Sequence, residues 1–115
     1  MGDAAVSARQ ATTLFDMAAP YYAWTRSHGD EQAHVGGSGI VDNIVPGESK
    51  SGGKPLTLAD AAWQLGLVET VYESVRHAGE LRTLGERWAG IVALVDFLAT
   101  QTDPALGVMR NQSIL

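Results

Sequence analysis

The sequence predicts a mainly α-helical protein. Two stretches, residues 57–78 and 81–100, carry apolar side chains at spacings of three and four, which is the pattern of a helix with one buried face. A third stretch, residues 4–19, is rich in alanine, a strong helix former. A glycine-rich region separates it from the other two and contains one short apolar run, residues 40–45, that favours a β strand. The fold class is therefore mainly α, with α+β as the alternative.

The first predicted helix covers residues 4–19. Asp3 is positioned to cap its N-terminus, and Pro20 disfavours helical geometry at the residue before it. Aromatic residues come immediately after it, and such patches on a small domain are typical of protein interfaces, with filling of a thin core as the alternative role. The predicted interface residues are Tyr21, Tyr22, Trp24 and Trp63.

The region between the first two helices, residues 27–56, is predicted to be a flexible connection. It holds more than half of the 13 glycines and several serines, a composition typical of loops. Within it only residues 40–45 are apolar enough to form a short β segment.

The second helix, residues 57–78, gives the clearest pattern in the sequence. Thr57 is suited to cap its N-terminus, and Gly79 stands where a left-handed residue commonly ends a helix. The residues that recur on one face are Leu58, Ala61, Ala62, Leu65, Val68, Tyr72 and Val75.

The third helix, residues 81–100, contains two interior glycines, Gly85 and Gly90, each of which costs about 1 kcal/mol relative to alanine. Two such residues indicate that another backbone approaches this helix closely. The predicted apolar stripe is Leu84, Trp88, Ile91, Val95 and Leu98. Because three helices close only a thin core, we expect the chain to complete its burial against a second chain.

The chain of 115 residues is predicted to form a single small domain, residues 1–115. Its formal net charge of -5 disfavours nucleic-acid and anionic-membrane partners, which need a basic face. With no cysteine, disulfides and thiolate chemistry are excluded. No apolar run approaches the roughly 20 residues of a membrane span, and no secretory signal pattern is present, so cytoplasmic residence is expected.

One cluster of metal-ligand residue types occurs, His28, Asp30 and His34. Two imidazoles and a carboxylate form the ligand set of many non-haem iron sites, so these three residues are the candidate metal ligands. The alternative is a solvated polar turn without a metal. No cofactor is expected under that alternative, and a divalent metal is expected under the first.

Other ionisable residues have two interpretations each. Glu73 and His77 lie one helical turn apart, which suits either a surface charge pair or a general-base pair. Asp16 interrupts apolar surroundings, as a buried acid does, but an aspartate at a helix edge gives the same pattern. No catalytic residues are assigned, because spacing alone does not assemble a nucleophile, a base and an orienting group.

Residues 50–82 resemble the last long helix of the Gfo/Idh/MocA family of NAD(P)-dependent oxidoreductases. The resemblance rests on Gly53-Lys54-Pro55, the run Leu67-Val68-Glu69-Thr70-Val71-Tyr72-Glu73-Ser74-Val75, and the stop at Ala78-Gly79. The glycine-rich dinucleotide loop and the Glu-Lys-Pro motif of that family are absent. The resemblance therefore implies a terminal segment without the family's chemistry.

Together these observations predict a small, non-catalytic helical module that forms homo-oligomers or supports a larger, oxidoreductase-like enzyme subunit. The alternative is a small metal-dependent enzyme that uses the cluster in residues 28–34.

Overall fold

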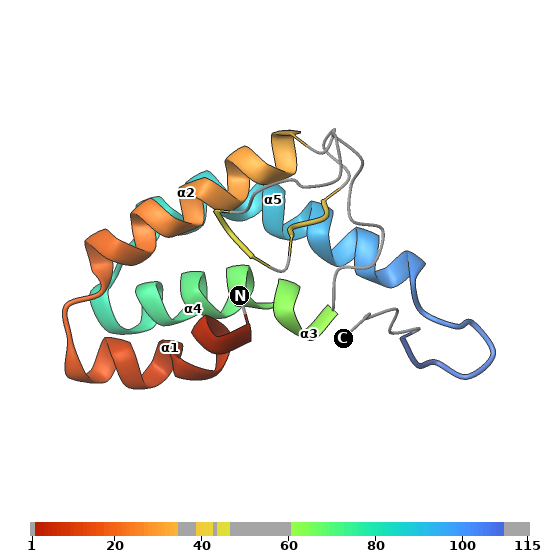
Figure 1. The fold of residues 1–115 in the computed structure, drawn as a ribbon, viewed down its shortest axis with the longest axis horizontal. Helices are drawn as coiled ribbons and strands as arrows, with labels where there is room; N and C mark the ends of the chain where they lie inside the picture. The colour runs from red at the N-terminus through yellow and green to blue at the C-terminus, as the bar shows by residue number, and fades with distance from the viewer. Residues whose placement is uncertain (1, 35–38, 43, 47–60, 110–115) are drawn as a thin grey trace.

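A computed structural model describes residues 2–34, 39–42, 44–46 and 61–109 of the chain (Figure 1). Within these ranges the protein is helical and forms no strand, apart from one isolated bridge between Thr102 and Met109. The mainly α prediction is confirmed. The helices are α1 (Gly2–Leu14), α2 (Ala18–His34), α3 (Ala61–Gln64), α4 (Gly66–Ala78) and α5 (Leu81–Thr100).

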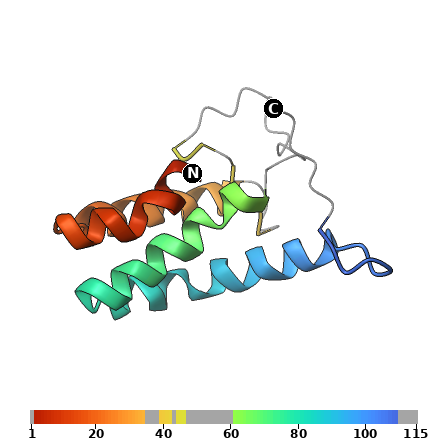
Figure 2. The ribbon, with the colours of Figure 1, turned by 90° about the horizontal axis from the view of Figure 1, so that it is seen from below.

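Helix α4 is the centre of the arrangement. It packs against α1, α2 and α5, and Figure 2 shows it lying between α1 on one side and α5 on the other. Short connections join α1 to α2 and α4 to α5, and both connections lie at the same end of the molecule (Figure 1). A pocket forms at this common end, between the α1–α2 turn and the last turns of α4.

The prediction for residues 4–19 is wrong about where the first helix ends and about the start of the next one. Helix α1 ends at Leu14, and α2 begins at Ala18 and continues through Pro20. Proline is accommodated there because the first turn of a helix has no partner for a backbone N–H. The initial part of the predicted flexible connection, residues 27–34, is therefore helical.

The second predicted helix, residues 57–78, is divided in the structure. Its first four residues lie outside the described ranges, and the rest forms the single turn of α3 followed by α4. The predicted end is confirmed: Gly79 has a left-handed φ of 69°, and its amide donates to the carbonyl of Val75 at 3.0 Å. The third prediction, residues 81–100, matches α5 in both bounds.

The predicted β segment, residues 40–45, is not a strand in its described residues. Val41 and Val45 are buried against the helices instead. Side chains of α2, and not a neighbouring strand, donate hydrogen bonds to backbone carbonyls of this segment. Trp24 Nε1 donates to the carbonyl of Val45 at 2.7 Å, and Gln32 Nε2 donates to the carbonyl of Gly39 at 2.9 Å.

The apolar core is small and joins that segment to α4 and α5. Its buried members are Val41, Val45, Leu67, Val71, Ile91 and Leu94. Gly90 has a close neighbour, because a Cβ there would lie 2.3 Å from Gln32 Oε1, but this neighbour is a side chain and not the predicted backbone. Trp88, which the pattern placed in the buried stripe, is instead 58% exposed. No helix in the described part is long and apolar enough to cross a membrane.

We predict that Leu94→Ala lowers the free energy of unfolding by about 2–5 kcal/mol, because Leu94 is fully buried and its truncation leaves a cavity. Chemical denaturation followed by circular dichroism measures this change. The matched control is Leu14→Ala, at a side chain that is 71% exposed, for which we expect a change below about 1 kcal/mol. Equal effects of the two substitutions would contradict the described core.

Candidate functional site

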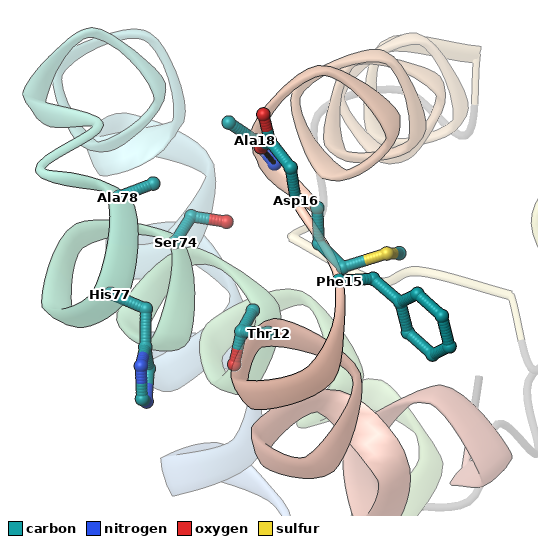
Figure 3. Close-up of a pocket in the computed structure, with 8 residues that line it drawn as sticks. Thr12, Phe15, Asp16, Ala18, Ser74, His77 and Ala78 are labelled. Carbon is teal, nitrogen blue, oxygen red and sulfur yellow. Dashed lines mark hydrogen bonds between the residues drawn. The ribbon is translucent and has the colours of Figure 1, made fainter.

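A pocket of about 420 Å³ lies between the α1–α2 connection and the C-terminal half of α4 (Figure 3). Its walls come from α1, the start of α2 and the distant α4, which meet because α1 and α2 both pack on α4. The lining residues are Thr12, Phe15, Asp16, Met17, Ala18, Ser74, His77 and Ala78.

Asp16 supplies the carboxylate of this pocket. Figure 3 shows it in the turn that leads into α2, and its Oδ1 accepts a hydrogen bond from the backbone amide of Ala18 at 3.2 Å. This bond satisfies one of the amides that a helix N-terminus leaves without a partner, and the positive end of the helix dipole attracts the carboxylate. Asp16 is exposed, so its second oxygen is accessible to a ligand.

His77 forms the opposite wall and is held by a buried carboxylate. Its Nε2 lies 3.0 Å from Glu73 Oε2, whose side chain is only 2% exposed, whereas that of His77 is 30% exposed. Glu73 also pairs with Arg76, at 3.6 Å. The two side chains are therefore close, as their spacing predicts, but Glu73 is buried, so they are not a pair of surface residues.

The two hydroxyl groups of the pocket already donate their hydrogens within the helices. Thr12 Oγ1 donates to the carbonyl of Ala8 at 3.0 Å, and Ser74 Oγ donates to the carbonyl of Thr70 at 2.7 Å. Both oxygens keep lone pairs, but Ser74 is buried, so of the two hydroxyls the half-buried Thr12 is the one that a ligand can reach. With the carboxylate of Asp16, the pocket is rich in acceptors and suits a ligand that carries several hydroxyl donors.

Phe15 adds an apolar surface at the rim. Its side chain is 67% exposed, and Figure 3 shows the ring pointing away from Ser74 and His77. The ring of Phe15 therefore lies beside the pocket and faces solvent rather than the polar groups. The site therefore has hydrogen-bond acceptors in the pocket and one exposed aromatic ring beside it.

The structure does not bring the predicted metal ligands together. His28, Asp30 and His34 all lie on α2, and the helical advance of about 100° per residue places Asp30 and His34 on one side of that helix and His28 on another. His28 is buried, whereas Asp30 and His34 are exposed. Across the described ranges, no group of three histidine, aspartate or glutamate side chains is placed to hold a metal ion.

The predicted interface residues mostly face the interior. Tyr21 is buried, and Trp24 and Trp63 pack against the core, which corresponds to the core-filling alternative. Tyr22 lies between α2 and α5, where its hydroxyl donates to Glu86 Oε1 at 3.2 Å and the guanidinium of Arg82 lies 4.5 Å from its ring centre.

His28 is a buried structural residue. Its Nδ1 lies 2.9 Å from the carbonyl of Trp24, and its ring meets the indole edge to face at 4.3 Å between ring centres. Burial lowers the pKa of His28 from 6.5 to about 4, an effect that the hydrogen bond to Trp24 partly opposes. The imidazole is therefore neutral at pH 7.

We predict that the folded protein loses stability as the pH falls from 6.5 to 4. In this range the unfolded chain takes up a proton at His28 and the folded chain does not, so protonation favours unfolding. The shift corresponds to roughly 3 kcal/mol. The measurement is the free energy of unfolding as a function of pH.

The matched variants for this prediction are His28→Gln and His34→Gln. We expect the first to lose most of the pH dependence between 6.5 and 4, and the second, at an exposed position of the same helix, to keep it. An unchanged slope in His28→Gln would show that another group causes the acid sensitivity.

The sequence singles out Asp16 and His77 separately, and nothing in it indicates that they line one pocket. They are about 60 positions apart, and only the packing of the α1–α2 connection on α4 places both at one pocket. The one signal in the sequence was the aspartate shortly before Pro20, which is typical of a capped helix start.

The comparison with known families gives one match. Residues 1–114 match the family described as bacterial alpha-L-rhamnosidase 6 hairpin glycosidase domain. No curated protein and no solved structure matches the chain. Of the described helices, α4 and α5 are joined by a short turn and pack on each other, as in a helical hairpin.

This match overturns the predicted resemblance of residues 50–82 to the Gfo/Idh/MocA oxidoreductases. The oxidoreductase-like module proposed from it is therefore also wrong. The resemblance failed because it rested on an amphipathic helix with a glycine stop, and unrelated folds share that pattern. The chain belongs to the family of bacterial alpha-L-rhamnosidase six-hairpin glycosidase domains.

Proposed function

We propose that this chain contributes sugar-binding helical hairpins to a glycosidase domain, with a rhamnosyl group held in the pocket between α1–α2 and α4. The observation that carries the proposal is the family match over residues 1–114. The acceptor-rich lining of the pocket supports it, because a sugar presents several adjacent hydroxyl donors.

Each polar group has a role in this proposal. The carboxylate of Asp16 accepts hydrogen bonds from two neighbouring sugar hydroxyls, and hydrogen bonds to a charged acceptor are the stronger kind. The hydroxyl oxygen of Thr12, which is half-buried, accepts a further bond. The imidazole of His77, whose Nε2 lies 3.0 Å from Glu73 Oε2, bonds another hydroxyl.

Glycoside hydrolysis needs two carboxyl groups, one as acid and one as base or nucleophile, on either side of the scissile bond. Among the described residues that line this pocket, Asp16 is the sole carboxylate, and Glu73 is buried behind His77. We therefore propose sugar binding for the described pocket, and hydrolysis for a domain in which a second carboxyl group from outside the pocket faces the same sugar.

Several expectations from the sequence remain predictions. Carboxyl-based glycoside hydrolysis uses no cofactor, which supports the expectation that none is bound. A partner that is either a second copy or a larger subunit, the absence of nucleic-acid and membrane partners, and cytoplasmic residence are all still to be tested.

The test is binding of L-rhamnose, measured by isothermal titration calorimetry for the unmodified chain and for Asp16→Asn. Asparagine caps a helix about as well as aspartate, so the substitution removes the charge without removing the cap. We expect the affinity to fall about tenfold or more, because a charged hydrogen bond contributes about 1.5–3 kcal/mol.

The matched control is Asp103→Asn. Asp103 Oδ1 accepts backbone hydrogen bonds from Ala105 at 2.9 Å and Leu106 at 3.2 Å, so it has a similar turn-capping role outside the pocket. We expect this variant to bind L-rhamnose like the unmodified chain. Equal affinities of all three proteins, or no binding by any of them, would refute the proposed pocket.

A further inference from the structure

Helix α5 presents a continuous apolar stripe on its exposed face. Its large members, Leu81, Trp88, Val92 and Val95, are 68%, 58%, 40% and 51% exposed. Exposed Gly85 and Ala99 lie on the same line, and the successive spacings of four and three keep all members on one side of the helix. The α5 stripe is defined by Leu81, Gly85, Trp88, Val92, Val95 and Ala99.

Nothing in the described part of the chain covers the α5 stripe. The helix packs on α4 and α2 with its other face, where Thr83, Ile91 and Leu94 are buried. A continuous row of exposed apolar side chains is typical of an interface. The α5 stripe therefore has the composition of an interface, but no described part of the chain packs on it.

Gly85 gives an independent indication of a partner. Glycine weakens a helix interior, yet a Cβ at this position would meet nothing within 4 Å. Gly90, by contrast, is explained inside the chain by Gln32. A second surface that packs closely over Gly85 accounts for a glycine that the described packing does not require.

We propose that the α5 stripe is the interface of a homodimer, in which two α5 helices pack antiparallel about a two-fold axis near position 90. The spacing of the stripe is the same in both directions, so an antiparallel copy matches it along its whole length. Trp88 then packs on the partner's Val92, Gly85 receives the partner's Val95, and Leu81 covers the partner's Ala99.

Charge complementarity favours a second copy in this orientation. Arg82 and Asp96 flank the α5 stripe on the same side, at nearly equal distances from its midpoint, with small Ala89 between them. The antiparallel arrangement brings Arg82 next to the partner's Asp96 twice. A parallel pair, related by a two-fold axis along the helices, would place the charged flanks of the two chains on opposite sides of the interface, so it would lack both Arg82–Asp96 pairs.

Arg82 has the capacity for this second interaction. Its side chain is 69% exposed, its Nε donates to Glu86 Oε1 at 2.9 Å, and its Nη2 donates to the hydroxyl of Tyr22. A guanidinium has five N–H donors, so donors remain for the partner's Asp96. The dimer is independent of the proposed sugar binding, since no α5 residue lines the pocket.

The first test is sedimentation equilibrium of the full chain over a range of concentrations. We expect a species of twice the 12.2 kDa of one chain, and a shift to monomer with a dissociation constant at least about tenfold higher for Val95→Glu. The matched control, Leu106→Glu, changes a residue that is 73% exposed but lies outside the α5 stripe, and it should remain dimeric.

The second test fixes the orientation by charge exchange. Arg82→Glu and Asp96→Arg should each weaken the dimer about tenfold, and the double variant should restore it, because the cross-chain pair is re-formed with reversed signs. The restoration also distinguishes a lost interface from misfolding, since a chain that does not fold is not rescued by a second surface change.

Some results would overturn the proposal. An unmodified chain that stays monomeric at every concentration would do so, leaving the α5 stripe to a different helical hairpin. A dimer that Val95→Glu does not weaken, or single charge variants that the double variant does not rescue, would contradict the antiparallel α5 interface. Circular dichroism of each variant verifies that the helical content is retained.

Discussion

The burial of α4 is the constraint on which the rest of the structure depends. Three helices pack on it, so its polar side chains must find partners within the protein. Thr70 and Ser74 donate to carbonyls one turn earlier, at 2.6 and 2.7 Å, and Glu73 pairs with His77. The same helix carries core residues and one wall of the pocket, so the geometry of the pocket is set directly by the packing of α4.

Local signals predicted the fold only where local interactions determine it. The bounds of α5 and the end of α4 at Gly79 were predicted correctly, because apolar periodicity and a left-handed glycine act within one element. The passage of α2 through Pro20 was missed, since a proline that ends one helix also fits the first turn of the next. Val41 and Val45 have strand-like propensities, but the helices bury them without a partner strand.

The candidate site was less predictable than the fold. The residue types of Asp16 and His77 were recognised, but their meeting depends on tertiary contacts between α1–α2 and α4 that no spacing in the sequence encodes. The histidine cluster failed for the opposite reason. His28 and His34 are close in the sequence, but they point to different sides of the same helix, α2. The buried ring of His28 packs against Trp24.

The central claim is that the pocket between α1–α2 and α4 binds a sugar. The most direct test is a nuclear magnetic resonance titration of the isotopically labelled chain with L-rhamnose, which tracks every backbone amide separately. Sugar binding in this pocket predicts saturable shifts concentrated at the amides of Thr12, Asp16, Ser74 and His77, with α5 unaffected. Shifts that are absent, that do not saturate, or that gather on α5 would contradict it.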